Sequence, residues 1–260
     1  MTGLGYRREM ADWDMSAIDA DFFEVAPENW IHRDLTPLHR LIESGRPVHL
    51  HGVALNLGGT APLNRVFLQA VRHLIDDLGA SCYSDHLAAS GDAHQLYDLF
   101  PTPFTHAEAR RIADRVCEAQ DLLGRQIAIE NTTWYTNIGE MPECEFIAHI
   151  LSWADCQLLL DINNLAVNHK NHHTACPAEF IKHLDLARIS YLHVAGHEFD
   201  PRFGLYLDTH SQPVESSTRL LAQQLRAQHG IPILLEWDND LPDPSTLNRE
   251  LACLKTSTPM

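Results

Sequence analysis

The sequence predicts an α/β protein, a single-domain (β/α)8 or TIM barrel that occupies residues 1–260. Three observations favour this fold. Eight short apolar runs alternate with segments of helical pattern, and 260 residues is the size expected for eight such units. The runs are nearly continuous in apolar residues, as in parallel strands that are covered on both faces. A doubly wound open sheet is the alternative, but the sequence has neither a GxGxxG motif after its first run nor a phosphate-binding loop.

The eight apolar runs are expected to form the strands of the barrel. Successive runs after the first are separated by about 30 to 45 residues, which fits the size of βαβ units. The first run is the shortest, so the closure of the barrel at this point is inferred from the other seven. The runs are TGLGY at the start of the chain, DFFEVAPEN (21–29), PVHLHGVAL (47–55), ASCYSDHLA (80–88), RQIAIENTT (125–133), CQLLLDINN (156–164), ISYLHVAGH (189–197) and IPILLEWDND (231–240).

Three of the segments between the runs carry clear helix signals. In THAEARRIADRVCEAQDLLG, Thr105 and Glu108 have the spacing of a capping box, and Gly124 ends the predicted helix. The segments PLNRVFLQAVRHLIDDLGA and PVESSTRLLAQQLRAQHG are expected to end in the same way, at Gly79 and Gly230. In the first of these helices, an apolar stripe of 3.6-residue period contains Ala109, Ile112, Val116, Ala119 and Leu123.

Net charge, hydropathy and cysteine content argue against several classes of protein. The formal net charge of −16 disfavours binding to nucleic acid and to anionic membranes. No apolar run approaches the roughly 18 residues of a membrane span, and the starting segment MTGLGYRREM lacks the apolar stretch of a signal peptide. We therefore expect a cytoplasmic protein without nucleic-acid or membrane partners. The six cysteines are scattered without a CxxC motif, so reduced thiols are expected.

Metal-ligating side chains stand at the carboxyl ends of seven consecutive runs. In a barrel these ends converge on one mouth, where the active sites of such folds are built. Buried carboxylates are costly without a partner, so a set of them in one mouth indicates bound cations. The residues are Glu24 and Glu28, His51, Asp85 and His86, Glu130, Asp161, His193 and Glu236.

The segment HVAGHEFDPRFGLYLDTH, residues 193–210, adds further candidate ligands. His197 lies four residues beyond His193, and Asp208 and His210 follow after a short excursion. The DxH spacing places the last two side chains on one side of an extended segment. A self-contained zinc site is one interpretation of this segment. Because His193 should face the same mouth as the other strand ends, we expect the segment to form one wall of a larger site.

Nine residues are candidate metal ligands, which is too many for one ion and suits two or three. A carboxylate such as Glu130 is expected to bridge two ions about 3.5–4 Å apart. Histidine and carboxylate ligands without thiolate fit iron, manganese or zinc, and the sequence does not choose among these metals. The nine candidates are His51, His86, Glu130, Asp161, His193, His197, Asp208, His210 and Glu236.

Other polar and aromatic residues near the strand ends are expected to support the ligands or contact a substrate. His49 shares a strand face with His51 and either fills the barrel interior or assists the site. Trp134, in the motif NTTWY, either packs a peptide at the mouth or anchors its loop. The remaining supporting residues are Glu28, Asn131, Asn163 and Asp238.

Seven motifs, in order along nearly the whole chain, together resemble one known family. They are FFEVAPENW, HLHGVALNLG, YSDHLA, IENTTWY, LLLDINNLAVN, HVAGH…DTH and LLEWDNDLP. The chain resembles the multinuclear non-heme iron-dependent oxidative enzymes, a family typified by the iron subunit of methanobactin biosynthesis. The resemblance implies a xylose-isomerase-like TIM barrel that holds two or three iron ions in mixed Fe2+ and Fe3+ states. It also implies O2-dependent oxidation of a ribosomally made precursor peptide, at cysteine, and a partner protein that presents the leader of that peptide.

Carried over residue by residue, the resemblance divides the ligands among three ions. Glu130 would bridge two irons, and three further residues, Asp161, His193 and Glu236, would complete the first of these sites. The second site would be served by His51 and His86, and the third by His197, Asp208 and His210. The residues expected to take part directly in catalysis are His51, His86, Glu130, Asp161 and Glu236.

Three other functions remain open from the sequence. A three-zinc phosphodiesterase barrel uses similar ligands, although the net charge of −16 argues against a DNA substrate. A metal-dependent sugar isomerase or epimerase needs a basic residue at the mouth, and His86 could serve, since the lysines are not at strand ends. A non-catalytic scaffold would bind metal and peptide without consuming O2.

Overall fold

Eight parallel strands close into one barrel in the computed structural model, which describes residues 1–92, 99–136 and 138–256. The strands follow one another around the barrel in the order β1-β10-β7-β6-β5-β4-β3-β2, and the ring closes where Gly3 of β1 pairs with Leu234 of β10. The predicted (β/α)8 barrel is therefore confirmed. The strands are β1 (Thr2–Gly5), β2 (Phe22–Val25), β3 (Val48–Gly52), β4 (Tyr83–His86), β5 (Ala128–Glu130), β6 (Gln157–Asp161), β7 (Ile189–Val194) and β10 (Ile233–Leu235).

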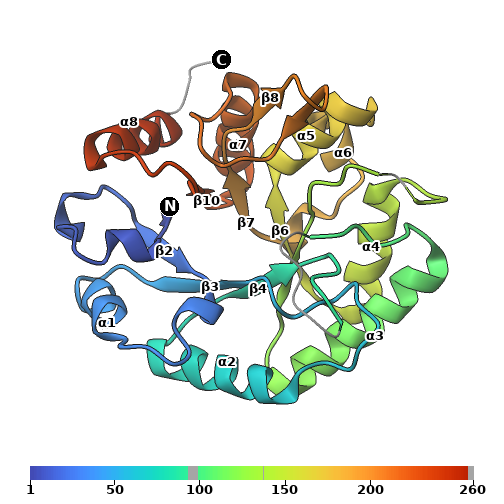
Figure 1. Cartoon of the computed structure of the whole chain (residues 1–260), viewed down its shortest axis with the longest axis horizontal. Helices are drawn as coiled ribbons and strands as arrows, with labels where there is room; N and C mark the ends of the chain where they lie inside the picture. The colour runs from blue at the N-terminus through green and yellow to red at the C-terminus, as the bar shows by residue number, and fades with distance from the viewer. Residues whose placement is uncertain (93–98, 137, 257–260) are drawn as a thin grey trace.

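Helices follow the strands and surround them as an outer layer (Figure 1). Within the described ranges, none of these helices combines the length and the apolar character needed to cross a membrane. The α-helices are α1 (Thr36–Glu43), α2 (Arg65–Leu78), α3 (His106–Leu123), α4 (Glu143–Ala154), α5 (Ile162–His172), α6 (Pro177–Ile181), α7 (Ser216–His229) and α8 (Pro244–Lys255). Short 3-10 helices are η1 (Arg8–Met10), η2 (Met15–Ala17), η3 (Pro27–Asn29) and η4 (Leu186–Arg188).

Helix α3 shows how local sequence fixes the ends and the buried face of an element. The Thr105 side chain accepts a hydrogen bond from the Glu108 backbone N–H, as the capping box predicts. The Glu108 carboxylate instead accepts from Arg111, so the reciprocal half of the capping box does not form. Gly124 ends the helix with a φ of 70°, a left-handed conformation that suits glycine. The whole predicted stripe is buried, namely Ala109, Ile112, Val116, Ala119 and Leu123.

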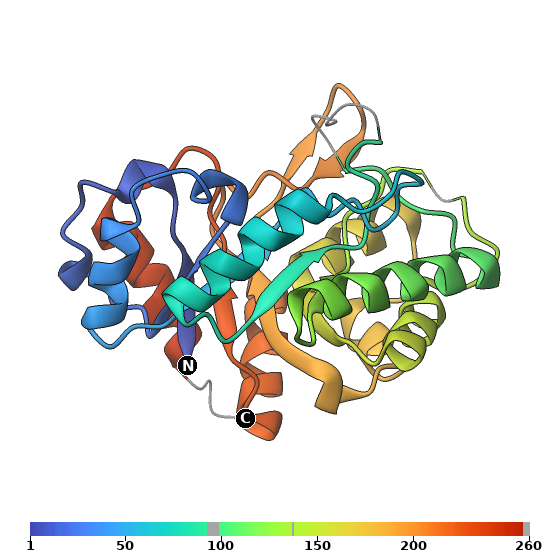
Figure 2. The same ribbon diagram turned by 90° about the horizontal axis from the view of Figure 1, so that it is seen from below.

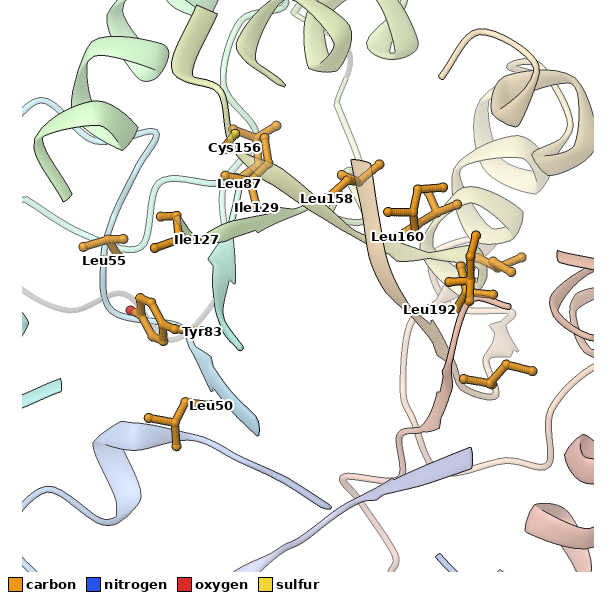
Figure 3. Packing of buried hydrophobic residues seen from close by; sticks show 14 of the residues in the cluster. Leu50, Leu55, Tyr83, Leu87, Ile127, Ile129, Cys156, Leu158, Leu160 and Leu192 are labelled. Carbon is orange, nitrogen blue, oxygen red and sulfur yellow. The ribbon is translucent and has the colours of Figure 1, made fainter. Parts of the chain in front are cut away.

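The main apolar core lies between the strands and the surrounding helices. Figure 3 shows Ile129, Leu158 and Leu160 projecting from β5 and β6 into this layer. Each of these side chains is fully buried. Burial of a side chain of this size stabilises the fold by about 1.5–3 kcal/mol relative to exposure, so this layer fixes the strand ends that carry the polar residues.

A second, smaller cluster fills the barrel interior. The rings of Phe22 on β2 and Tyr191 on β7 are 6.4 Å apart, although these strands are not neighbours in the ring. Their contact therefore crosses the interior. A Cβ atom on Gly3 would lie 2.4 Å from the Phe22 ring, so glycine is required beside it. The centroid of the His49 ring lies 4.6 Å from that of Phe22 and 5.2 Å from that of Tyr191. His49 therefore helps to fill the barrel interior, which is the first of its two predicted roles.

The segment after β7 departs from the alternation of strands and helices. Strands β8 (Glu198–Asp200) and β9 (Leu205–Leu207) pair in antiparallel fashion as a separate two-stranded sheet. Figure 2 shows this orange hairpin projecting beyond one end of the barrel. The hairpin carries the chain away from β7 and returns it to the barrel, where His210 donates its backbone N–H to the Gly196 carbonyl.

Candidate metal centre

Metal-ligating side chains gather at the carboxyl end of the barrel. The strand register sets His86 beside Glu130 and Asp161 beside His193. Every member of the set is buried except His86, which is partly exposed. The barrel therefore brings together side chains that are far apart in the sequence, namely Glu24, His51, His86, Glu130, Asp161, His193 and Glu236.

Glu130 joins two histidines in the first ligand group. Its Oε2 atom lies 3.0 Å from His51 Nε2 and 3.1 Å from His86 Nε2. Both His51 Nε2 and Glu130 Oε2 are buried without a hydrogen-bond partner, despite the short distance between them. Polar atoms that approach closely without hydrogen-bond geometry have the arrangement of ligands directed at one shared ion.

The second ring nitrogen of each histidine is held by a neighbour. His86 Nδ1 lies 2.9 Å from the Gly52 carbonyl oxygen, which can only accept, so Nδ1 carries a proton and donates it. His51 Nδ1 lies 2.9 Å from Ser84 Oγ. These contacts fix the ring orientations and direct both Nε2 atoms toward Glu130, as is usual for histidines that bind metals.

His193 lies at the centre of a second ligand group, with three carboxylates around its Nδ1 atom. The distances are 3.0 Å to Glu236 Oε2, 3.1 Å to Glu130 Oε1 and 4.0 Å to Asp161 Oδ2. Glu130 uses Oε1 here and Oε2 in the first group. Because its two oxygens face two different groups, Glu130 has the placement of a bridging ligand.

A chain of buried polar groups connects the first group to the second below the mouth. The Tyr191 hydroxyl donates to Glu24 Oε2 at 2.5 Å and lies 2.9 Å from Ser84 Oγ. Glu24 Oε2 is also 3.0 Å from His193 Nε2, which donates to it because a carboxylate only accepts. The chain thus runs from His51 through the two hydroxyls and Glu24 to His193, and it orients both rings.

His210, Glu236 and Asp238 form a third ligand group. His210 Nδ1 is 3.2 Å from Asp238 Oδ2 and 3.5 Å from Glu236 Oε2. The Arg7 guanidinium, two residues beyond β1, contacts both carboxylates, with its Nη2 atom 3.0 Å from Glu236 Oε1. A side-chain cation therefore already neutralises part of the negative charge of this group.

His197 and Asp208 lie outside these three groups. His197 Nδ1 is 2.7 Å from Asn163 Oδ1, and its Nε2 is 2.7 Å from Lys170 Nζ, so both ring nitrogens have partners. Asp208 accepts a hydrogen bond of 2.6 Å from Asn163 Nδ2 and lies 2.8 Å from His210 Nε2. The structure thus brings Asp208 to the edge of the third group, while His197 pairs with Lys170.

Two of the predicted supporting residues hold the backbone of ligand-bearing strands. Asn131 donates to the Asp161 carbonyl oxygen and accepts from the Asp161 N–H, both at 2.9 Å. Glu28 accepts from the N–H groups of Val53 and Ala54, each at 2.9 Å. The first pair of bonds fixes the end of β6, and the second fixes the chain just beyond β3.

Trp134 is 2% exposed and packs inside the protein. Its ring stacks on His172, with 4.2 Å between centroids, and its Nε1 donates to Glu143 Oε2 at 3.0 Å. The Phe104 ring lies 6.0 Å away in an edge-on arrangement. Of the two roles predicted for Trp134, this packing is that of a loop anchor.

Electrostatics of the mouth couple its acids to its bases. Burial would raise the pKa of Glu130, but the three neighbouring histidines outweigh burial and hold that pKa well below its usual range. Burial raises the pKa of Asp161 well above its usual range, and Glu130 adds to this effect. Burial would lower the pKa of His51, but Glu130 and Glu24 raise it to about 9. Protons on histidines thus balance the carboxylates when no cation does so.

The donor set fits bound metal ions. Each buried polar atom without a partner costs about 1–3 kcal/mol, and coordination to a cation would remove that cost. Histidine and carboxylate donors suit iron, manganese and zinc. Among the described residues, the unpartnered buried atoms at the mouth include Glu24 Oε1, Glu28 Oε2, His51 Nε2, Glu130 Oε2, Asp161 Oδ2 and His210 Nε2.

A cavity of about 390 Å³ opens onto these groups. His51 and His86 of the first group line it, as do all three members of the third group. The charged side chains of Arg8 and Glu9 form another part of the wall. A molecule that enters the cavity therefore meets the first and third groups directly.

Comparison with known proteins establishes the family. A family profile described as "RiPP precursor modification enzyme MbnB/TglH/ChrH" matches residues 1–258. The chain belongs to this family. A UPF0276 protein of Nitrosospira multiformis is 40% identical over 260 residues, covering 96% of this chain and 90% of that protein. A UPF0276 protein of Pseudomonas aeruginosa PAO1 is 42% identical over 260 residues, covering 95% and 89%. The family predicted from the seven motifs is confirmed.

Several solved structures share the fold of this family member. A 3-keto-D-glucoside 4-epimerase of E. coli aligns with a TM-score of 0.66 at 14% identity over 98% of both chains. Endonuclease IV of Thermus thermophilus gives 0.66 at 16% identity over 97% of this chain and 98% of its own. A xylose isomerase domain protein of Salmonella typhimurium gives 0.64 at 14% identity over 96% and 94%. This confirms the xylose-isomerase-like barrel and shows the fold alone.

Sequence reasoning gave less prominence to three residues of the site. Glu24 was noted as a strand-end residue but not as a candidate ligand, yet it contacts His193. Asp238 was expected to support ligands and lies in the third ligand group itself. Arg7 was not predicted. Its position two residues beyond the first strand is the same kind of signal that identified the acidic strand ends.

Proposed function

We propose that this RiPP precursor modification enzyme is an O2-dependent oxidase that holds two or three iron ions in mixed Fe2+ and Fe3+ states. The observation that carries the proposal is the position of Glu130, whose two oxygens face His51 and His193 in different ligand groups. A carboxylate in this position suits two ions about 3.5–4 Å apart. The abundance of carboxylates also favours the higher oxidation states of iron, because negative ligands offset the added positive charge.

The three ligand groups give the proposed distribution of the ions. Iron bound there would supply O2 activation and a place for the substrate sulfur. Glu24, Tyr191 and Ser84 would keep the histidine rings in their ligand orientation. The first ion would be held by His51, His86 and Glu130, the second by Glu130, Asp161, His193 and Glu236, and the third by His210, Glu236 and Asp238.

The proposed substrate is a cysteine of a ribosomally made precursor peptide. A cavity of about 390 Å³ has room for a few residues of an extended peptide. His86 and His210 line this cavity, so the thiol of a bound peptide can approach the first and the third ligand group. The proposal also includes a separate partner protein that presents the leader of the precursor. The six cysteines of the chain are unpaired, as suits a reducing cytoplasm.

Metal analysis of protein made in iron-replete cells and purified without oxygen tests the proposal. We expect two or three irons per chain, with Mössbauer spectra of magnetically coupled ferric ions. Addition of a precursor peptide should cause O2 uptake, whereas the same peptide with its cysteines replaced by alanine should not. Zinc without iron, even after iron supplementation, would overturn the proposal and favour a phosphodiesterase or an isomerase. Bound iron without O2 uptake in the presence of peptide would instead indicate a metal-binding scaffold.

A further inference from the structure

A fourth group of metal-ligating side chains lies outside the barrel, between helices α3 and α4. His106 is the first residue of α3, and Glu145 and His149 are one turn apart on α4. One ligand atom from each of the three lies within 4.8 Å of the other two. The two helices pack side by side in the outer layer (Figure 1), so the cluster joins neighbouring elements.

The ring of His149 contacts two other aromatic rings. It stacks on Trp153 with 4.8 Å between centroids and 19° between planes, and the His106 ring lies 4.7 Å from it. His149 Nε2 is buried without a hydrogen-bond partner, although the rest of the side chain is partly exposed. The nearest carboxylate oxygen, Glu145 Oε1, is 3.7 Å away, which is too far for a hydrogen bond. The unpartnered nitrogen therefore lies near the Glu145 carboxylate without being hydrogen-bonded to it.

We propose that His106, Glu145 and His149 form a peripheral site for one divalent cation of the zinc class. Two imidazoles and one carboxylate form a ligand set typical of Zn2+, and they leave at least one coordination position for water. The same donors accept Ni2+ and Cu2+ but are poorly suited to Ca2+ or Mg2+, which prefer oxygen ligands. The cation would satisfy His149 Nε2.

A cation at this site would hold the first turns of α3 and α4 together at the edge of the barrel mouth. Both helices begin on the mouth side, because each follows the carboxyl end of a strand. Phe104, just before α3, packs 5.0 Å from Phe146 of α4 and 6.0 Å from the Trp134 anchor. A cation held by His106 and His149 would add a rigid link between these same segments. The Glu145 charge offsets the unfavourable position of a cation near two helix N-termini.

Zinc titration of the iron-loaded full-length protein tests this site. The matched variants are His149→Ala, Glu145→Gln and, as a control, His73→Ala, which removes an exposed histidine from helix α2. Calorimetry would measure the zinc equivalents and affinity, and elemental analysis would check that the iron content stays constant. Thermal unfolding with and without zinc provides a second readout.

We expect wild type and His73→Ala to bind one zinc that His149→Ala lacks, and zinc to raise the Tm of the first two proteins but not of the third. Even loss of a group that orients a ligand lowers metal affinity about 10- to 100-fold, so Glu145→Gln should bind at least about tenfold more weakly. X-ray absorption of the added zinc should show two imidazole ligands. Equal zinc binding by wild type and His149→Ala, with the iron retained, would overturn the proposal.

Discussion

His51 Nε2 and Glu130 Oε2 lie 3.0 Å apart inside the barrel mouth, yet they do not form a hydrogen bond. Glu130 extends its other oxygen to His193 at 3.1 Å. One carboxylate thereby links strands β3 and β7 through β5. Glu130 is the residue that the first and second ligand groups share, and a change there should affect both groups together.

Replacing Glu130 with Gln should release the metals of the first and second groups at the same time. The amide keeps the size of the side chain but removes the charge and one of the two ligand oxygens. The measurement is metal per chain in protein purified without oxygen. Glu118→Gln, at an exposed residue paired with Arg65, is the matched control and should keep its metal. Loss of one metal with full retention of the other would argue against a bridging role.

Replacing Tyr191 with Phe should weaken metal binding without abolishing it. The variant keeps the buried ring and removes the hydroxyl between Ser84 and Glu24. Loss of such an orienting group weakens metal binding by about 10- to 100-fold, which faster iron release to a chelator would report. Ser84→Ala should act in the same direction. The double variant should bind metal no more weakly than the more severe single variant, because both substitutions interrupt the same series of hydrogen bonds. Fully additive losses of metal affinity would contradict this coupling.

Replacing Arg7 with Met should have opposite effects on the metal-free protein and on the third ligand group. Glu236 and Asp238 lose their guanidinium partner, so the free energy of unfolding without metal should fall by about 2 kcal/mol. The same loss removes a competitor for these carboxylates, so a cation should bind the third group more tightly. Chemical denaturation and metal titration measure the two effects. Arg33→Met, which makes the same change in net charge at an exposed residue outside the cavity of the barrel mouth, should show neither effect.

Variants of His197 and His210 should show whether His197 is a ligand of the third metal ion, as the family resemblance implies, or whether the ion binds at the third ligand group. His210→Gln should remove metal from the third group, because His210 Nδ1 faces Asp238 and Glu236. His197→Gln should leave the metal content unchanged, because both ring nitrogens of His197 already have protein partners. Elemental analysis of both variants decides the matter. Metal loss in His197→Gln equal to that in His210→Gln would restore His197 as a ligand.

Glu143 should make the stability of the fold depend on pH. Burial raises the pKa of Glu143 to about 7, and hydrogen bonds from Trp134 and Asn168 offset only part of this effect. Because the folded-state pKa lies above the unfolded value of about 4.3, the stabilising contribution is present below pH 4.3 and is lost as pH rises through 7.

The Glu143→Gln variant stays neutral at every pH. It should therefore exceed wild type in the free energy of unfolding by about 2 kcal/mol at pH 8, and by much less at pH 5. Urea denaturation at the two pH values measures the difference. Glu140→Gln, a nearby exposed change, serves as the control. A constant difference between variant and wild type at both pH values would show that Glu143 does not titrate in this range.

Much of the fold and of the first two ligand groups could be predicted from the sequence, because both follow from short-range pattern. Apolar runs mark strands, and in a barrel the end of each strand faces the mouth, so residues such as Asp161 and His193 could be placed together without coordinates. The exception within the mouth was Glu24, whose contact with His193 depends on side-chain reach across the barrel.

The association of His210 with Glu236 and Asp238 in one group could not be predicted, because loop paths determine it. The β8–β9 hairpin is built from two three-residue strands, too short to produce a recognisable pattern. It redirects the chain so that His210, with a φ of 47°, faces Asp238. His197, which precedes β8, instead contacts Lys170 of helix α5. Spacing along the segment carries no information about such partners.

The pairing of β1 with β10 joins segments that lie far apart in the sequence and leave the ribosome at very different times. The ribosome releases Arg7 and Glu24 early, whereas Glu236 emerges only after most of the chain. A nascent chain that still lacks Glu236 cannot assemble the complete second or third ligand group. Under the proposed metal assignment, the second and third groups can be filled only after Glu236 has left the ribosome, so metal delivery to these two groups would follow synthesis of the barrel.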